Sequence, residues 1–240
     1  MLQVVKNETR EAMGAAAARQ VAAWLRGVLE EQATANVIFA AAPSQNEFLS
    51  ALVADTSIDW GRINGFHMDE YLGLDPQAPQ LFGTFLKDNL FDKVRFREVF
   101  YIDSQALDPQ RECDRYAALL QQVDVVCMGI GENAHIAFND PPVADFHDPV
   151  LVKTVTLDEV CRQQQVNDGC FASLDLVPTT AITLTIPALM RARFISCVVP
   201  GVRKRQALEG TLTAPVSEKI PATILRTHPA AILFADNENI

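Results

Sequence analysis

The sequence predicts an α/β fold with a doubly wound, mainly parallel sheet and helices on both faces. Short apolar segments alternate along the chain with segments of helical pattern. The apolar segments lack the alternation of polar and apolar residues that a half-exposed sheet would show, which indicates strands buried on both faces. No internal repeat, low-complexity tract or Pro/Gly-rich linker interrupts the 240 residues, so we expect one domain over residues 1–240.

The first half of the chain supplies four of the expected helices and four of the expected strands. Residues 9–32 are Ala-rich with apolar residues three or four apart, which predicts an amphipathic helix. The segment 36–42 predicts a strand, and a helix is expected from Ser44 to Val53, with Ser44 and Glu47 as a capping box. Further strands are expected at 62–69, 99–103 and 123–130, and further helices at 81–91 and 110–122.

The second half continues the same alternation. Strands are expected at 181–186, 193–200 and 230–236, with helices that begin near Pro187 and Arg203. In such a sheet, ligands bind beyond the carboxyl ends of the strands, where the strand order reverses. Polar residues that directly follow a predicted strand are therefore the candidates for a functional site.

Charge and composition limit the classes of partner. The net charge is −10 and the pI is near 4.8, which argues against nucleic acid and anionic membranes as partners. A small anionic substrate remains compatible, because a few local cations and a helix N-terminus can bind one phosphate. No apolar run is long enough to span a bilayer, and the charged N-terminus lacks the pattern of a signal peptide, so we expect a cytoplasmic protein.

The five cysteines indicate neither structural zinc nor a disulfide framework. Their number is odd, and no C-x-x-C pair occurs. Cys127 and Cys197 lie in apolar, strand-like segments, where a free cysteine behaves as a small core residue.

The first polar cluster, Asp69-Glu70-Tyr71, lies at the end of the strand predicted at 62–69. A solvated turn capped by Asp69 would account for it. The functional interpretation is a carboxylate in a partly apolar crevice, where desolvation raises its pKa toward the range of a general base.

The second cluster, in "MGIGENAHIAFNDPP" (128–142), follows the apolar strand predicted at 123–130. Gly129 and Gly131 permit close approach of a ligand to the backbone. His135 is suited to proton transfer near neutral pH. Asp140 can orient its imidazole, and Asn133 can hydrogen-bond a hydroxyl. An ordinary turn needs none of these polar side chains, so this combination predicts a catalytic site.

The third cluster is basic and follows the strand predicted at 193–200. Arg203, Lys204 and Arg205 open a helix after the turn at Gly201. Cations at a helix N-terminus oppose the helix dipole, and an anionic ligand would resolve the conflict; a basic surface turn is the alternative.

The loop that contains Ser44 and Glu47 is a weaker candidate for anion binding. It lies between a predicted strand and a predicted helix, the geometry that holds a phosphate. Its capping box would satisfy the helix amides, Glu47 would repel an anion, and it contains no glycine. These residues favour a helix start over a phosphate cradle.

Several other catalytic chemistries lack their motifs. The chain has no Gly-x-Ser-x-Gly, no His-Glu-x-x-His, no Walker A loop, and no Gly-x-Gly-x-x-Gly after the first predicted strand. His67 and Asp69 with His135 could suggest a metal, but their spacing is not diagnostic, and we expect none.

Together, "FHMDEYLGL" (66–74), "MGIGENAHIAFNDPP", "RKRQALEG" (203–210) and "PATILRTHPAAILFAD" (221–236) resemble the glucosamine-6-phosphate deaminase/isomerase family. The likeness covers most of the chain in the same order and with similar spacing. The related 6-phosphogluconolactonases typically carry Asp-Glu-Arg where this chain has Asp-Glu-Tyr, and they lack the Ala-Phe-Asn-acid-Pro segment.

The resemblance implies a modified Rossmann-like fold of the sugar-phosphate isomerase type, no organic cofactor, and a phosphorylated amino sugar as substrate. The proton-shuttling acid of the family falls on Asp69 and its ring-opening histidine on His135. Asp140 and Asn133 fall on the residues that support this histidine, and Lys204 falls on a phosphate-binding lysine.

The sequence departs from the family pattern at four places. The phosphate loop reads Ala42-Pro43-Ser44-Gln45-Asn46, in which only Ser44 is retained, and the glycine before the histidine is Ala134. Asp140 replaces a longer Glu. The segment 161–175 has no clear match to the phosphate-binding arginine of the family, for which Arg162 and Arg203 are the candidates.

The expected function is therefore isomerisation and deamination of glucosamine 6-phosphate or galactosamine 6-phosphate, which yields a ketose phosphate and ammonia. Asp69, His135, Asp140 and Asn133 are expected to be catalytic. Substrate contacts are expected from Glu70, Gly129, Gly131, Ser44, Lys204, Arg203 and Arg162. The alternatives are a sugar-lactone hydrolase and a non-catalytic sugar-phosphate sensor. A homo-oligomer is expected by family analogy alone.

Overall fold

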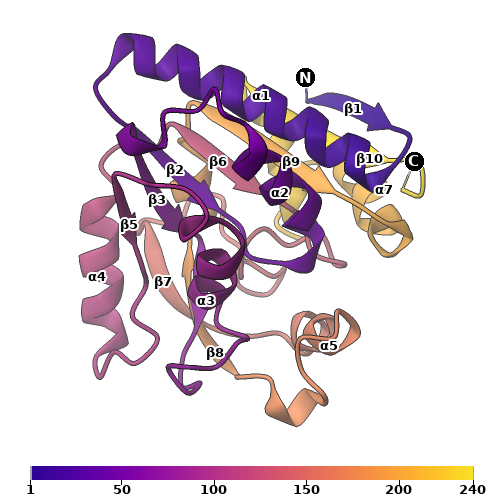
Figure 1. Cartoon of the computed structure of the whole chain (residues 1–240). Coiled ribbons are helices and arrows are strands. Elements are labelled where there is room, and N and C mark those ends of the chain that lie inside the picture. The colour runs from indigo at the N-terminus through magenta and orange to yellow at the C-terminus, as the bar shows by residue number, and fades with distance from the viewer. Residues whose placement is uncertain (1, 240) are drawn as a thin grey trace.

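The computed structural model describes residues 2–239, and its centre is a seven-stranded sheet (Figure 1). All neighbouring strands in this sheet run parallel, which confirms the predicted fold class. The strands lie in the order β1 (Gln3–Asn7), β10 (Ala231–Asp236), β9 (Phe194–Val199), β6 (Val125–Met128), β2 (Ala35–Phe39), β3 (Ile63–His67) and β5 (Glu98–Phe100).

A second, three-stranded sheet is antiparallel and was not predicted. Its order is β4 (Asp69–Tyr71), β8 (Thr180–Leu184) and β7 (Val152–Thr156). The strand predicted at 62–69 is thus divided at Met68 between the two sheets, and the strand predicted at 181–186 belongs to the second sheet. Asp69 consequently begins a new strand instead of ending the old one.

Seven α-helices accompany the sheets within residues 2–239. They are α1 (Arg10–Glu31), α2 (Asn46–Ala54), α3 (Phe82–Leu86), α4 (Pro109–Leu119), α5 (Glu159–Asn167), α6 (Ile186–Met190) and α7 (Arg205–Thr213); α3 continues into a π-helical turn, Lys87–Phe91. Successive residues of a strand point to opposite faces of the sheet, and Val37 and Ile38 of β2 accordingly belong to two separate apolar clusters. One cluster contains α1 and α2 and the other α4 and α7, so helices cover both faces of the parallel sheet, as predicted.

The predicted capping box of Ser44 and Glu47 is wrong. Pro43–Gln45 form a 3-10 turn, and α2 begins at Asn46 without a side-chain cap. Glu47 instead accepts hydrogen bonds from Nε and Nη2 of Arg10, at 3.0 and 3.1 Å. This pairing follows from the close packing of α1 on α2, where a Cβ at Gly14 would lie 2.6 Å from the backbone of Glu47. The negative charge of Glu47 is thereby neutralised by Arg10.

The strand order reverses between β2 and β6. From β2 the chain proceeds outward to β3 and β5, whereas from β6 it proceeds to β9 and β10 on the other side. The loops that follow β2 and β6 therefore diverge at the carboxyl end of the sheet, where α/β proteins bind ligands. Gly129 lets these loops pack closely, because a Cβ there would lie 3.0 Å from Nε2 of Gln45.

None of the helices that residues 2–239 form is both long enough and apolar enough to cross a membrane.

Candidate active site

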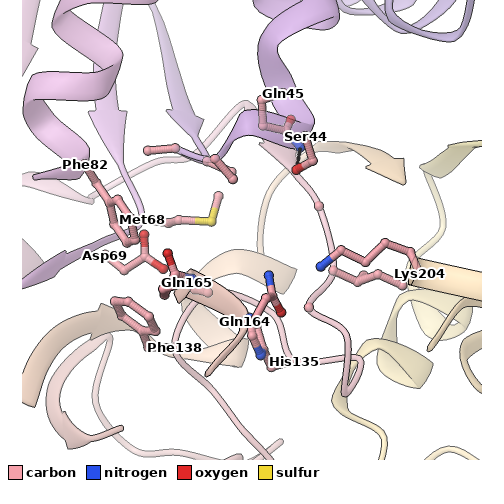
Figure 2. A pocket seen from close by; sticks show the side chains of 17 residues that line it. Ser44, Gln45, Met68, Asp69, Phe82, His135, Phe138, Gln164, Gln165 and Lys204 are labelled. Carbon is pink, nitrogen blue, oxygen red and sulfur yellow. Dashed lines mark hydrogen bonds between the residues drawn. The ribbon is translucent and has the colours of Figure 1, made fainter. Parts of the chain in front are cut away.

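A cleft opens at this reversal point, with an empty volume of about 520 Å³ including its mouth. Six segments contribute to its wall: residues 40–45, Met68 with Asp69, Phe82, residues 129–138, Gln164 with Gln165, and Lys204. Figure 2 shows Asp69 and Lys204 at opposite sides of the cleft, with His135 between them.

Asp69 presents a carboxylate to an apolar part of the cleft. Phe82 and Phe138 lie beside it (Figure 2), and their rings stack with centroids 5.5 Å apart. Asp69 is only 7% exposed, and this burial, together with the negative charge of Glu70, raises the pKa of Asp69 well above its usual value. A carboxyl group with a raised pKa can both accept and return a proton near neutral pH.

His67 holds the backbone at Asp69 and takes no part in the cleft. Its Nε2 accepts a hydrogen bond from the backbone N–H of Ile102 at 2.9 Å, so Nδ1 carries the proton and donates to the carbonyl oxygen of Asp69 at 2.9 Å. Complete burial lowers the pKa of His67 to about 4, and the ring is neutral at pH 7. His67 therefore lies apart from His135, and its role is to hold the backbone in place.

Glu70 lies next to Asp69 but turns away from the cleft. Its Oε1 accepts from the backbone N–H groups of Tyr71 and Phe82, at 2.9 and 3.0 Å, and its Oε2 accepts from that of Gly83 at 2.8 Å. The carboxylate therefore caps the start of α3. Burial raises the pKa of Glu70 to about 7, although these N–H groups oppose the shift. The structure does not bring Glu70 to the position expected of a substrate contact.

The loop after β6 brings the backbone of Gly131 against the ring of His135. A Cβ at Gly131 would overlap the imidazole, so only glycine fits there. Ala134 adopts φ of +63°, the left-handed conformation that costs an L-residue roughly 1–2 kcal/mol. Hydrogen bonds hold it there: its N–H donates to the carbonyl of Gly131, and its carbonyl accepts from the N–H of Ala222. Alanine therefore takes the left-handed conformation at the position where the resemblance expects a glycine.

His135, Asn133 and Asp140 form one hydrogen-bonded group. Nδ1 of His135 lies 2.8 Å from Oδ1 of Asn133 and 2.9 Å from Oδ1 of Asp140, and the amide of Asn133 donates to the same Asp140 oxygen. Because both neighbours of Nδ1 are acceptors, Nδ1 carries a proton, and Nε2 is the nitrogen available for exchange. Burial opposes ionisation of Asp140, but His135 and Asn133 outweigh it and lower the pKa of Asp140. The predicted triad is brought together, and Asp140 reaches His135 despite its shorter side chain.

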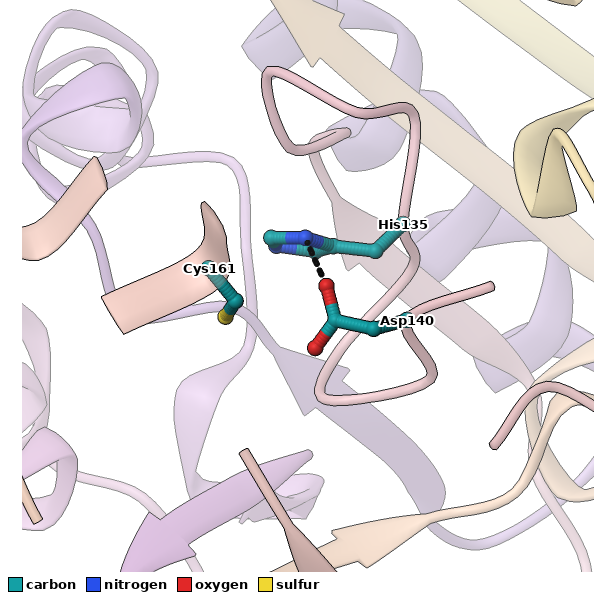
Figure 3. A group of neighbouring side chains, drawn as sticks. All are labelled: His135, Asp140 and Cys161. Carbon is teal, nitrogen blue, oxygen red and sulfur yellow. Dashed lines mark ion pairs between the residues drawn. The ribbon is translucent and has the colours of Figure 1, made fainter. Parts of the chain in front are cut away.

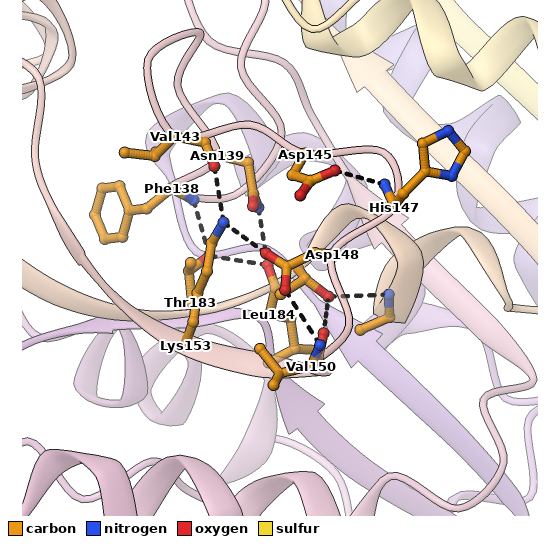
Figure 4. A network of polar contacts seen from close by, with 12 residues as sticks. Phe138, Asn139, Val143, Asp145, His147, Asp148, Val150, Lys153, Thr183 and Leu184 are labelled. Carbon is orange, nitrogen blue, oxygen red and sulfur yellow. Dashed lines mark hydrogen bonds and ion pairs between the residues drawn. The ribbon is translucent and has the colours of Figure 1, made fainter.

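The second sheet fixes the loop that carries Asp140 (Figure 4). Asn139 donates to the carbonyls of Ile136 and Leu184, at 2.9 and 2.8 Å. Nζ of Lys153, on β7, donates to the carbonyl of Val143 and to Asp148, at 2.7 and 2.8 Å. These contacts fix the chain on both sides of Asp140, so the antiparallel sheet supports the His135–Asp140 pair.

Lys204 supplies a buried positive charge at the far side of the cleft. It is 7% exposed, and burial lowers its pKa, an effect that Asp168 and Glu132 oppose. Within residues 2–239 no carboxylate lies within ion-pair distance of its Nζ. Ser44 and Gln45 line the same side (Figure 2), and the Ser44 hydroxyl is not used as a helix cap. This side of the cleft is suited to an anionic group.

Arg203 and Arg162 are not brought into the cleft. Arg203 has a side chain that is 62% exposed, and it donates to the carbonyl of Asn167 at 2.7 Å. Arg162 donates to the carbonyls of Leu174 and Val177, and it thereby holds the chain that follows α5. Neither guanidinium occupies the place expected of a phosphate-binding arginine.

Sequence reasoning missed the amides of the cleft. Gln164 and Gln165 come from α5, and Gln45 comes from the loop after β2. Oε1 of Gln164 accepts from the backbone N–H of Glu132 at 2.8 Å, which attaches α5 to the loop that carries His135. The polar composition of α5 gave no helical hydrophobic pattern, so only its N-cap, Asp158, signalled a helix start.

The sequence is similar to proteins of a known family. Residues 8–233 match the model of the glucosamine-6-phosphate isomerase/6-phosphogluconolactonase family. The chain belongs to this family. A glucosamine-6-phosphate deaminase of Lysinibacillus sphaericus is 38% identical over 192 residues, which are 79% of this chain and 85% of the relative. One of Listeria monocytogenes is 32% identical over 205 residues, 85% of this chain and 86% of the relative.

Solved structures of this family have the same fold. A monomeric glucosamine-6-phosphate deaminase has a TM-score of 0.89 at 27% identity, with 99% of this chain and 98% of that chain covered. The 6-phosphogluconolactonase of Thermotoga maritima has a TM-score of 0.79 at 19% identity, with 99% and 100% covered. The second likeness concerns the fold alone.

Proposed function

We propose that this protein converts glucosamine 6-phosphate and water into a ketose 6-phosphate and ammonia. The observation that carries the proposal is one cleft with Asp69 and the buried cation of Lys204 at opposite sides and His135, paired with Asp140, between them. Membership of the family and relatives named glucosamine-6-phosphate deaminase support it.

His135 opens the sugar ring. Its Nδ1 is held by Asn133 and Asp140, so Nε2 is the atom that exchanges a proton. Nε2 takes the proton of the anomeric hydroxyl and returns one to the ring oxygen, and the ring bond between C1 and that oxygen breaks. The product is the open-chain aldehyde. Asp140 stabilises the imidazolium that exists between the two transfers.

Asp69 then moves a proton from C2 to C1. Its carboxylate removes the C2 proton, the electron pair forms the C1–C2 double bond, and the C1–O1 π bond opens as O1 takes up a proton. Asp69 then returns its proton to C1 of this enolamine. The nitrogen lone pair forms the C2–N double bond, and the amino group becomes an imine as it loses one proton, which balances the proton gained at O1. The raised pKa of Asp69 suits this reversible transfer, and the two phenylalanines beside it keep the carboxylate poorly hydrated.

Hydrolysis of the imine completes the reaction. Water adds to C2, and the resulting carbinolamine loses its nitrogen as ammonia, which leaves a ketone at C2. Every step is a proton transfer or the addition or loss of a neutral molecule, so the electrons balance without a redox partner. The phosphate end is held by Lys204, with Ser44 and Gln45 beside it.

The test is ammonia release by purified protein with glucosamine 6-phosphate and, in parallel, with galactosamine 6-phosphate. We expect ammonia and a ketose phosphate in equal amounts from the first. Ammonia from the galactosamine epimer alone would move the substrate assignment to that sugar. Acid release from a 6-phosphogluconolactone without ammonia would favour the hydrolase, and thermal stabilisation by the sugar phosphate without product would favour a sensor.

A further inference from the structure

One buried oxygen of the His135–Asp140 pair has no hydrogen-bond partner within the part of the chain that the structure describes. Oδ1 of Asp140 is shared by His135 and Asn133, whereas Oδ2 is inaccessible to solvent and unpaired among residues 2–239. Asp140 as a whole is 1% exposed. A buried carboxylate oxygen without a donor has lost its hydration with no hydrogen bond in return, so a neighbouring group that can donate to it matters.

Cys161 is that neighbour. A nitrogen of His135, a carboxylate oxygen of Asp140 and Sγ of Cys161 all lie within 4.8 Å of one another, and all three residues are buried. Figure 3 shows the imidazole above the carboxylate and the thiol beside it. A thiol is a weak donor. Burial and the negative charge of Asp140 raise the pKa of Cys161 well above its usual value, so the sulfur retains its proton at neutral pH.

The helix that carries Cys161 is attached to the loop that carries His135 at two points. Cys161 and Gln164 are three residues apart on α5, so they share one face of the helix. Gln164 accepts from the backbone of Glu132, before His135, and Cys161 lies at Asp140, after it. The face of α5 therefore contacts the loop on both sides of the histidine.

We propose that Cys161 is a positioning residue whose thiol donates to Oδ2 of Asp140 and keeps this carboxylate turned toward His135. The role rests on the proposed function, because it acts through the ring-opening histidine. The other acidic groups that act on Cys161 are Asp69 and Asp158, and each favours the protonated thiol. Tyr71 and the cation of Lys204 also lie close enough to interact electrostatically with Cys161.

The experiment compares Cys161→Ala with Cys161→Ser, which restores a donor. For Cys161→Ala we expect kcat to fall about 3- to 10-fold, the loss of one hydrogen bond, and the acid limb of its pH profile to move to higher pH. KM should stay within about twofold, because Cys161 does not line the cleft. Cys161→Ser should return kcat and the limb to near wild type. Should Cys161→Ala not fold, Cys161→Val, which also lacks a donor, takes its place.

Cys113→Ala is the matched control. Cys113 is also 1% exposed and lies on a helix, α4, outside the His135–Asp140 pair. It should leave both kcat and the pH profile unchanged. A wild-type profile in Cys161→Ala, or a serine variant as impaired as the alanine variant, would overturn the proposal, since volume and not the donor would then matter.

A second measurement does not depend on activity. Carbon-13 NMR of the Asp140 carboxyl should show a higher pKa in Cys161→Ala than in wild type, and recovery in Cys161→Ser. An unchanged titration would refute the role of Cys161 even if the enzyme is active. If the wild-type protein releases no ammonia but the pKa of Asp140 still differs between wild type and Cys161→Ala, only the proposed function would be refuted.

Discussion

Two adjacent carboxylates, Asp69 and Glu70, show how neighbouring residues of like charge acquire different roles. Both are buried at the start of β4, where side chains alternate between the two faces of the strand. One faces the cleft and the other meets three backbone N–H groups at α3. The sequence could predict a functional acid here, but assigning Glu70 to a helix cap requires knowing that residues 82–83, twelve and thirteen positions away, return to it.

Glu70→Gln should show a stability difference from wild type that depends on pH. The folded pKa of Glu70 is about 7, above the ordinary 4.5, so its stabilisation is full below pH 4.5 and is lost as pH rises to about 7. As pH rises across that window, the free energy of unfolding of the variant should increase by about 3 kcal/mol relative to that of wild type. Urea unfolding at several pH values measures this difference. His67 titrates in the same window in both proteins and cancels, whereas Asp69, whose pKa the charge of Glu70 helps to raise, contributes to the same difference. A difference that is constant with pH would contradict this account.

At the scale of elements, the sequence predicted most strands of the parallel sheet, because buried parallel strands are short apolar runs that need no knowledge of their partners. It missed β1, which is partly exposed at the edge of the parallel sheet, β7, which has both buried and exposed residues, and α5, which is mostly polar. It also placed 181–186 in the wrong sheet, since pairing with β4 and β7 depends on contacts distant in sequence. The site residues on predicted strand ends were found, whereas the amides from α5 were not.

Two glycines of α1 should respond oppositely to alanine. At Gly27 a Cβ would meet nothing within 4 Å, so Gly27→Ala should stabilise the protein by roughly 0.5–1 kcal/mol through helix propensity. At Gly14 a Cβ would overlap the backbone of Glu47, so Gly14→Ala should destabilise by roughly 1–3 kcal/mol and loosen α2. Urea unfolding of both variants measures this, and equal effects would argue against close packing of α1 on α2.

At the scale of the whole molecule, an acidic protein places a buried positive charge in its cleft. The net charge is −10, and Lys204 lies buried at the carboxyl end of the sheet. A long-range field of this sign repels anionic ligands, so phosphate binding must depend on local groups. Placing a desolvated cation there reduces stability in exchange for that local binding.

Lys204→Met should therefore raise stability and weaken binding together. We expect a Tm roughly 2–4 °C higher without ligand, the shift that 1 kcal/mol produces in a chain of this size. KM for glucosamine 6-phosphate should rise roughly 10- to 100-fold, the loss of a charge-assisted contact. The matched control is Arg203→Met. The side chain of Arg203 is exposed and lies outside the cleft, so this substitution should leave KM unchanged. An unaltered KM in Lys204→Met would show that the phosphate lies elsewhere.

The most direct test of the central claim is ammonia release from glucosamine 6-phosphate by wild type and by Asp69→Asn. We expect wild type to release ammonia and Asp69→Asn to lose at least about 10²-fold in kcat, since an amide cannot transfer the proton. The variant should keep a wild-type Tm and still be stabilised by the sugar phosphate. Full ammonia release by a correctly folded Asp69→Asn would contradict the account.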